Sequence, residues 1–529
     1  MKIFVCQIKP EIGNLEKNYL QILRGYEEAL IQNCDLCLFP ELAISGYMSE
    51  DLFLNKQYIS DITDYTHKLI NSTKNCVLVL PTVINKEDEV FNGAIVAENK
   101  KIIGITFKHN LPNYGIFDEK RYFSSGKPVV IDIKGLKIGI PICEDIWDKK
   151  VCHTLKNQGT QLFLVPNGSP YDKFKIKHRI NLVEERFNET SIPIIYCNQA
   201  MSQDGIVFDG TSFCYDGKVQ IIGKSFCQDH NVVEFSAGKF KCHTEYDLID
   251  NSEEEILEAI IFATREYVIN NGFKKVILGL SGGIDSAVVA YIATRALGKE
   301  NVITYMLPFK YTSKESIDDA LELSSNLGIR LVNMPIDDIY DAFDSGLKQH
   351  LHRKEYSITF QNLQSRIRGT ILMALANENH SLLLTTGNKS EYAVGYATIY
   401  GDMNGAFNPI KDIYKTEIYH LAKKINLDNN IIPERIISRF PSAELAPNQK
   451  DSDTLPNYDI LDQILARHIE LNENKTELYK KFPVETVDRV LTLVKNAEFK
   501  RRQSAPGIKI STKNFEKDRR YPITNFYNK

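Results

Sequence analysis

A loop of serine and glycine near the middle of the chain has the residue types that bind phosphate. Residues 279–286 read Gly-Leu-Ser-Gly-Gly-Ile-Asp-Ser and follow the apolar run 276–278. A strand, such a loop and a helix together present backbone N–H groups and a helix N-terminus to an anion. Glycine permits close approach, Ser281 and Ser286 add hydroxyl donors, and Asp285 can hold a divalent cation. The loop lacks the Gly-Lys-Ser/Thr ending of a Walker A motif, and the alternative explanation is an ordinary glycine-rich turn.

Three side chains in the first half have types that could act together on a carbonyl group. Glu41 follows the apolar run 36–39, Cys143 follows the run 138–142, and Lys108 lies between them in the sequence. Each has an ordinary explanation alone: a surface acid, a packed cysteine and a surface lysine. Together they could form a nucleophile with its base, because a thiol reacts only after it loses its proton.

The elements that must position these residues differ between the two halves. Residues 1–240 alternate short apolar strands with helices, for example at 76–80, 137–140 and 162–165, which indicates a layered α/β domain. A polar stretch follows, and a helix then opens with Ser252 as its predicted cap and Glu255 completing a capping box. We therefore predict a first domain over residues 1–243 and a second over 251–529.

The second half has the order of a parallel sheet. After the Ser-Gly loop we predict a helix to Gly298, a strand over 302–307, a helix to Gly328 and a strand over 330–334. This βαβαβ order gives a right-handed, doubly wound parallel sheet, which binds ligands at the carboxyl ends of its strands. Residues 440–458, rich in Pro, Asn and Asp, are predicted to form a loop that could act as a lid.

Composition narrows the function classes. The chain has 529 residues with 64 basic and 68 acidic side chains, a balance that gives no reason to expect nucleic-acid binding. No apolar run is long enough to cross a membrane, and the first residues are typical of a strand, so we expect a cytoplasmic protein. All ten cysteines lie in the first half and are expected to be reduced. Cys34 and Cys37 form a CxxC, for which we favour core packing over metal binding.

The first half resembles the nitrilase, or carbon–nitrogen hydrolase, superfamily. The matching segments are FPEL, KxxLPNYxxFDExRYF, ICEDIW, NGSPY and QDGIVFDGTSF. The resemblance implies an αββα sandwich with a Glu41–Lys108–Cys143 triad that hydrolyses a carboxamide through a thioester. It also implies that Glu119 orients the lysine and that His109 is structural. The family more often has alanine where this chain has Gly168, and we expect this small-for-small change to be harmless. The residues it implies for glutamine binding are Tyr114, Ser169 and Lys175.

The second half resembles the ATP pyrophosphatases, and among them the NAD synthetases. SGGxDS carries the first resemblance; QNLQSRIR, TTGNKSE, YGDMNG, PIKDIYKT, PSAELAPNQKDSDTLPNYDILDQIL and FKRRQSAPGIKI carry the second. The family uses deamido-NAD, ATP and glutamine. The implied ATP contacts are Gly279, Leu280, Ser281, Gly282, Gly283, Ile284, Asp285, Ser286 and Thr386. The implied Mg²⁺ ligands are Asp285 and Glu391. The implied deamido-NAD contacts are Asn362, Arg366, Glu391, Asp402 and Lys500.

The chain departs from the family pattern at two places, and three alternative functions remain open at this point. The segment Pro308–Ser313 departs from the family pattern on the adenine side, and Glu516 stands where the family often has glycine. Lys500, Arg501 and Arg502 could be only a solvated charge run. The rivals are a tRNA-modifying pyrophosphatase, a nucleotide-binding module without activity, and an amidase with a structural second half. The interpretation we prefer is a glutamine amidotransferase that acts on small molecules. We expect it to be a homo-oligomer, at least a dimer.

Overall fold

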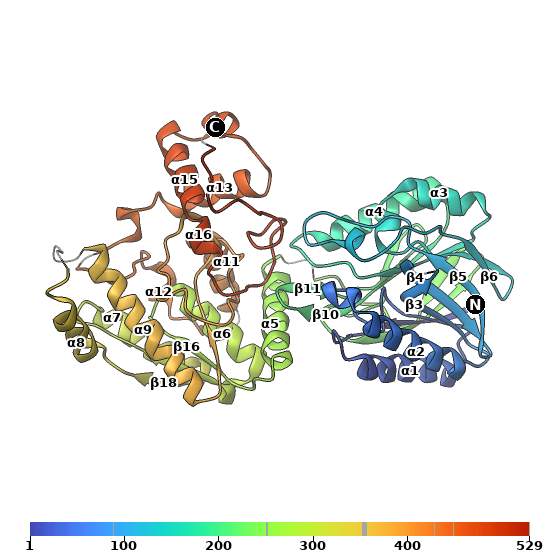
Figure 1. Ribbon diagram of the computed structural model, residues 1–529, viewed down its shortest axis with the longest axis horizontal. Helices are drawn as coiled ribbons and strands as arrows, with labels where there is room; N and C mark the ends of the chain where they lie inside the picture. Colours follow the sequence, from blue (N-terminus) through green and yellow to red (C-terminus); the bar gives the residue numbers. More distant parts are fainter. Residues whose placement is uncertain (88, 250–251, 352–356, 428, 448, 528–529) are drawn as a thin grey trace. The chain divides into compact units, whose positions relative to one another are not determined.

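The protein folds as two compact units, Met1–Asp250 and Asn251–Lys529. In this computed structural model, coloured along the chain in Figure 1, the structure describes residues 1–87, 89–249, 252–351, 357–427, 429–447 and 449–527. The predicted domain start at 251 lies outside the described residues, so the domain limits stay a prediction. None of the described helices has the length and apolar character needed to cross a membrane.

Two large sheets, a two-stranded ribbon and four α-helices make up the described part of the first unit. One sheet has the order β15–β14–β1–β2–β3–β4–β5, the other has the order β13–β12–β9–β8–β7–β6, and β10 pairs with β11. The first-sheet strands are β1 (Lys2–Gln7), β2 (Leu36–Leu38), β3 (Val77–Lys86), β4 (Glu89–Glu98), β5 (Lys101–Phe107), β14 (Asp229–Ser236) and β15 (Lys239–Cys242). The other strands are β6 (Val130–Ile133), β7 (Leu136–Gly139), β8 (Leu162–Asn167), β9 (Ile194–Asn198), β10 (Ala200–Gln203), β11 (Ile206–Asp209), β12 (Phe213–Tyr215) and β13 (Val219–Ile221).

Alternation along the strands creates the predicted αββα layering. In β1, Ile3 and Val5 pack between the two sheets against residues such as Leu162, whereas Phe4 and Cys6 pack beneath the helices of the first sheet. The helices are α1 (Leu15–Ile31), α2 (Lys56–Ser72), α3 (Lys149–Asn157) and α4 (Lys175–Thr190), with short 3₁₀ turns at 50–54, 119–121 and 143–146. Cys34 and Cys37 lie in the core under α1 and α2, as predicted.

A four-stranded parallel sheet with the order β18–β17–β16–β19 forms the centre of the second unit. Its strands are β16 (Val276–Gly279), β17 (Val302–Met306), β18 (Arg330–Asn333) and β19 (Leu382–Leu384). The helices up to the last strand are α5 (Ser252–Asn270), α6 (Ile284–Leu297), α7 (Lys314–Leu327), α8 (Asp337–Leu347) and α9 (Ile358–Glu378). The later ones are α10 (Lys389–Val394), α11 (Lys415–Ile425), α12 (Glu434–Ser438), α13 (Tyr458–Ile469), α14 (Lys475–Tyr479), α15 (Val484–Asn496) and α16 (Glu498–Arg501).

The predicted βαβαβ order is confirmed, and the doubly wound sheet places the Ser-Gly loop at the carboxyl end of β16. The loop ends where α6 begins, and Gly282 has a φ of +80°, a conformation that glycine adopts without strain. Of the predicted loop 440–458, residue 448 lies outside the described residues, a 3₁₀ turn over Asp451–Asp453 interrupts the rest, and the last residue is helical because α13 begins at Tyr458. Ser252 is the first described residue of α5, so its predicted capping role cannot be assigned to a position before the helix.

Candidate active sites

The first candidate site is a buried ion-pair network between two carboxylates and one lysine. Lys108 Nζ lies 2.7 Å from Glu41 Oε1 and 2.6 Å from Glu119 Oε1, and the lysine and Glu41 are 0% exposed. Burial lowers the pKa of Lys108, but Glu119 and Glu41 outweigh it and raise that pKa well above its usual range. The ammonium is therefore permanently charged, as an oxyanion partner must be.

Glu41 is fixed by donors on both of its oxygens. Asn92 Nδ2 donates to Glu41 Oε1 at 2.7 Å, and the backbone N–H of Gly168 donates to Glu41 Oε2 at 2.8 Å. Glu119 in turn accepts the hydroxyl of the buried Tyr47. The structure thus brings Glu119 to the lysine as the sequence predicted, and it adds Asn92, which no motif identified.

The candidate nucleophile lies on a strained turn at the end of the second sheet. Cys143 begins the 3₁₀ turn Cys143–Ile146 with a φ of +47°, an uncommon value for a side chain with a Cβ. The Asp145 carboxylate holds the turn by accepting the N–H groups of Ile142, His109 and Asn110. This contact joins the turn to the residues that follow Lys108, and His109 takes part through its backbone, as a structural residue does.

Burial raises the pKa of the Cys143 thiol well above its usual range. The carboxylate of Glu41 adds to this effect and the Lys108 ammonium opposes it. The thiol therefore rests protonated, and its reaction requires a base at the moment of attack.

Of the three predicted glutamine-binding residues, Tyr114 contacts a carboxylate and Lys175 lies against an aromatic ring. Tyr114 Oη donates to Glu144 Oε2 at 2.9 Å, and Lys175 Nζ lies 5.0 Å from the centre of the Trp147 ring. Glu144 carries one charge and Lys175 the opposite one, which suits the two ends of an α-amino acid.

Ser169, the third, is more enclosed. Its hydroxyl accepts Nε of the buried Arg179 at 3.0 Å, and Arg179 also forms an ion pair with Asp209 at 2.8 Å. The serine is therefore a fixed, almost fully buried group.

Gly168 is packed more tightly than the sequence suggested. A Cβ at this position would lie 2.6 Å from Tyr47 Cγ and 2.7 Å from Gln199 Nε2. Real Cβ contacts are never this short, so the expectation that alanine would be equivalent conflicts with the packing here. Glycine lets Tyr47 approach the strand end where its hydroxyl reaches Glu119.

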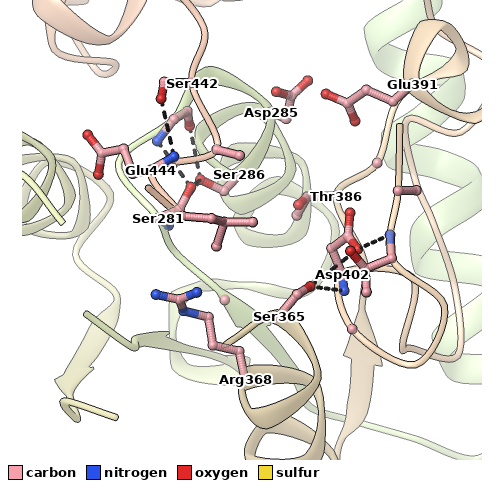
Figure 2. Close-up of a pocket in the computed structure, with 18 of the residues that line it drawn as sticks. Ser281, Asp285, Ser286, Ser365, Arg368, Thr386, Glu391, Asp402, Ser442 and Glu444 are labelled. Carbon is pink, nitrogen blue, oxygen red and sulfur yellow. Dashed lines mark hydrogen bonds between the residues drawn. The ribbon is translucent and has the colours of Figure 1, made fainter. Parts of the chain in front are cut away.

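The second candidate site is a cavity of about 470 Å³ at the carboxyl edge of the parallel sheet. Figure 2 draws some of the side chains that line it, with Ser281 and Ser286 near the centre of the view. The structure brings nearly all predicted ATP and deamido-NAD residues to this cavity: Gly279 to Ser286, Thr386, Asn362, Glu391, Asp402 and Lys500. Arg366 is not among the lining residues, and its Nε donates to the carbonyl of Ile399 at 3.2 Å.

A lysine that the motifs did not single out joins the two predicted metal ligands. Lys415 Nζ contacts Asp285 and lies 3.7 Å from Glu391 Oε1. Asn388 Nδ2 donates to Asp285 Oδ1 at 3.0 Å, and its side chain caps α10 at Glu391 N. Burial raises the pKa of Glu391, and the charge of Asp285 adds to this effect, whereas Lys415 lowers that pKa. Two carboxylates that line the same cavity as the Ser-Gly loop are a donor set that fits Mg²⁺, which would complete its shell with phosphates and water.

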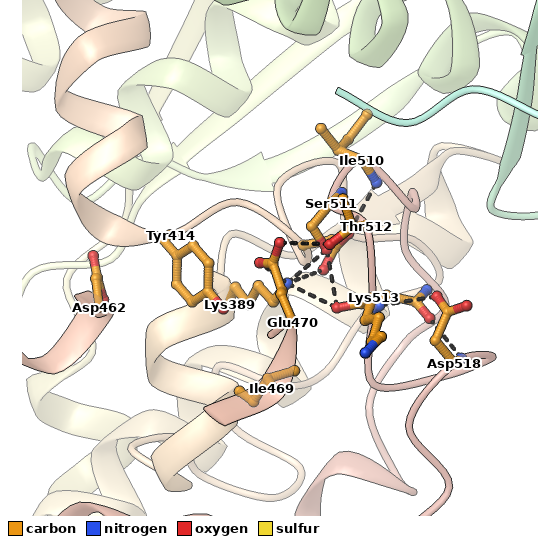
Figure 3. Close-up of polar contacts among 12 residues, drawn as sticks. Lys389, Tyr414, Asp462, Ile469, Glu470, Ile510, Ser511, Thr512, Lys513 and Asp518 are labelled. Atoms are coloured by element: carbon orange, nitrogen blue, oxygen red, sulfur yellow. Dashed lines mark hydrogen bonds and ion pairs between the residues drawn. The ribbon is translucent and has the colours of Figure 1, made fainter. Parts of the chain in front are cut away.

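A buried polar cluster holds the helix that carries Glu391 (Figure 3). Lys389 Nζ lies 2.9 Å from Asp412 Oδ1 and 3.0 Å from Glu470 Oε1, and it donates to Ser511 Oγ at 2.6 Å. Asp412 also accepts the backbone N–H groups of Ile510 and Ser511. The C-terminal segment is thus tied to the first turn of α10, which positions Asn388 and Glu391.

Comparisons with known proteins agree with both halves. The family model of carbon–nitrogen hydrolases matches residues 2–231, and that of NAD synthases matches residues 256–504. The glutamine-dependent NAD(+) synthetase of Acinetobacter baylyi is 41% identical over 99% of this chain and 98% of its own length. The chain belongs to the glutamine-dependent NAD(+) synthetase family. The relative from Thermotoga maritima is 39% identical with the same coverage. The solved Acinetobacter baumannii synthetase, in complex with ADP, has a TM-score of 0.81 at 39% identity, covering 99% of this chain and 98% of that one.

The structure places one of the two departures, Glu516, and the basic run at 500–502. Glu516 forms an ion pair with the mostly buried Lys411, so the residue found where the family often has glycine has a partner of its own. In the basic run, Lys500 Nζ donates to the carbonyls of Gly395 and Ala397 at 2.7 Å each. Arg501 is buried and donates to the carbonyl of Ala393 at 2.6 Å. These two residues are not a solvated charge run.

Proposed function

We propose that this chain makes NAD by amidating deamido-NAD, with ATP as the activating substrate and glutamine as the source of ammonia. The products are NAD, AMP, pyrophosphate and glutamate. One observation carries the proposal: the same chain buries Glu41, Lys108 and Cys143 close enough for their charges to interact, and it has a separate cavity lined by the Ser-Gly loop, Asp285 and Glu391.

In the first site, Glu41 takes the Sγ proton of Cys143 as sulfur attacks the carboxamide carbon of glutamine. Lys108 and the backbone N–H after Cys143 stabilise the oxyanion. The C–N bond breaks when Glu41 returns the proton to nitrogen, which releases ammonia and leaves a thioester. Glu41 then deprotonates a water molecule that attacks the thioester, and the thiol leaves with that proton.

The mouth of this site favours an α-amino acid over a simple amide. Glu144, which holds Tyr114, supplies a carboxylate for the substrate ammonium, and Lys175 supplies an ammonium for the substrate carboxylate. Burial raises the pKa of Glu144, and Lys175 acts in the opposite direction.

In the second site, the Ser-Gly loop binds the ATP phosphates and Lys415 offers them a positive charge. Asp285 and Glu391 would hold Mg²⁺, which offsets the negative charge of the departing pyrophosphate. An oxygen of the deamido-NAD carboxylate attacks the α-phosphorus, pyrophosphate leaves, and ammonia then displaces AMP from the adenylate. Asn362, Asp402 and Lys500 line the cavity and would contact deamido-NAD. Arg366 lies on α9, the helix that also carries Asn362.

The test is an assay for NAD from deamido-NAD and ATP, with glutamine or ammonium as the nitrogen donor and Mg²⁺ omitted in a parallel series. We expect NAD with either donor and none without Mg²⁺. Turnover of ATP to AMP without amidation of deamido-NAD would contradict the proposal. We further propose a homo-oligomer of at least two chains in the cytoplasm, which light scattering of the purified chain and imaging of a tagged chain would test.

A further inference from the structure

Arg368 lines the second cavity, and the resemblance gave it no role although it ends the segment QNLQSRIR. It is on α9, two residues after Arg366, and this spacing turns the two side chains to different faces of the helix. Arg368 lines the cavity, whereas Arg366 does not. The helix therefore presents one of its two arginines to the ligand space beside β17.

Within the part of the chain that the structure describes, one nitrogen anchors the guanidinium of Arg368. Its Nε donates to the carbonyl oxygen of Leu307 at 2.9 Å, and Leu307 directly follows β17. Among the described residues, no carboxylate lies within 4 Å of it; the acidic groups that it senses are Glu444 and Asp337. Burial lowers its pKa to about 10, so it remains charged near neutral pH. Its terminal N–H groups remain available to a ligand.

A partly buried guanidinium with one backbone hydrogen bond and no ion pair costs free energy, and its planar donors recover that cost when a ligand in the cavity supplies acceptors. An exposed position would avoid the cost altogether. The placement is therefore explained by binding rather than by stability.

The position within the cavity indicates which part of the ligand it meets. In Figure 2, Arg368 lies at the end opposite Asp285 and Glu391, with the phosphate-binding serines between the two ends. Apolar side chains line its surroundings, among them Leu307 and Leu372. An apolar pocket with a few fixed donors is the environment that suits a nucleobase, not a triphosphate.

We propose that Arg368 binds the adenosine half of ATP, donating to acceptor atoms of the base or ribose. The inference rests on the proposed function and gives it a residue on the adenine side, where the segment Pro308–Ser313 departs from the family pattern. Its anchor, Leu307, immediately precedes that segment. Both ATP and deamido-NAD contain adenosine, and the proposal commits to ATP because the Ser-Gly loop shares the cavity wall with Leu307.

The experiment measures direct binding to the full-length protein, so that it does not depend on NAD formation. Arg368→Gln is titrated by calorimetry with AMP, with pyrophosphate and with deamido-NAD. We expect the affinity for AMP to fall about tenfold or more, the loss expected for hydrogen bonds from a charged donor. Affinity for pyrophosphate and deamido-NAD should stay within about twofold. Adenosine should lose affinity in the same proportion as AMP.

Three results would overturn the inference: unchanged AMP binding, a loss confined to pyrophosphate, or a loss confined to deamido-NAD. Because Arg368→Gln leaves the Leu307 carbonyl without its donor, Arg368→Lys is tested alongside, with thermal melting to confirm folding. The lysine keeps the charge but not the planar donors, and full recovery of AMP affinity would also count against the inference. Arg330→Gln, at an exposed position on β18 of the same unit, is the control. If the wild-type chain made no NAD, the proposed function would fail while the binding result stood.

Discussion

The two candidate sites place their charges in different ways. In the first unit, Glu41 and Lys108 are both fully buried and satisfy each other without a substrate. In the second unit, the side chains of Asp285 and Glu391 retain 18% and 17% exposure and face an open cavity. One site is assembled before its ligand arrives, and the other leaves room for a ligand that brings its own charge.

This difference follows from the chemistry of each substrate. A neutral carboxamide supplies no charge, so the protein must fix the base, the nucleophile and the oxyanion partner in advance. ATP brings several negative charges with it, so the protein needs N–H groups, a lysine and metal ligands that remain accessible. The comparison predicts that the first site tolerates little change of shape, whereas the second responds most to changes of charge.

The largest expected effect is loss of the lysine between the two metal-binding carboxylates. Lys415→Met leaves Asp285 and Glu391 without their positive partner, and synthesis should fall at least about 100-fold with glutamine or with ammonium. Glutaminase activity should persist. Lys423→Met, at an exposed position on α11, is the matched control. Wild-type synthesis by the Lys415 variant would show that the cavity does not depend on this charge.

A change of shape should damage the first site alone. Gly168→Ala places a methyl group against the Tyr47 ring, and if the overpacking cost of about 1–3 kcal/mol is borne by the active geometry, glutaminase activity should fall about 5- to 150-fold. Ammonium-dependent synthesis should be unchanged. Gly346→Ala, where a Cβ meets no atom within 4 Å, is the control. Normal glutaminase activity in the Gly168 variant would refute the idea that this site is rigid.

The resting state of the nucleophile gives a pH test. Burial raises the pKa of Cys143 well above the usual range. The thiolate fraction should therefore be small at neutral pH and still increase with pH under alkaline conditions. The alkylation rate of Cys143 by iodoacetamide should therefore climb through pH 9 without a plateau, as followed by mass spectrometry. A plateau near pH 7 would mean that the resting enzyme already holds a thiolate.

The smallest effect is expected at Glu516. Glu516→Gln removes its ion pair with Lys411, a pair whose glutamate side chain is 30% exposed. We expect a loss of about 0.5–1 kcal/mol in the stability of the second unit, with unchanged catalysis. The melting temperature measures it, and any loss of glutaminase activity would be unexpected.

What the sequence could predict follows from local order. The Ser-Gly loop, its strand and its helix are contiguous, and Glu41 and Cys143 each follow an apolar strand, so motif and spacing identify them. The fold class follows from the alternation of strands and helices in the same way.

The features that the sequence could not predict depend on tertiary contacts. Gly168 N reaches Glu41 across 127 residues, and Lys415 reaches Asp285 across 130. Arg366 and Arg368 are chemically equal in sequence, and only the orientation of α9 distinguishes the one that lines the cavity. The tight packing at Gly168 could not be predicted either, because the Tyr47 ring, which is distant in sequence, sets it.

The measurement that tests the division of labour most directly is the nitrogen-donor dependence of Cys143→Ala. The thiol belongs only to the first site, so NAD formation from glutamine should fall below about 1% of the wild-type rate, in line with loss of covalent catalysis. With saturating ammonium, the rate should stay within about threefold of wild type, because the second site makes no use of the thiol. Equal loss with both donors would contradict the account.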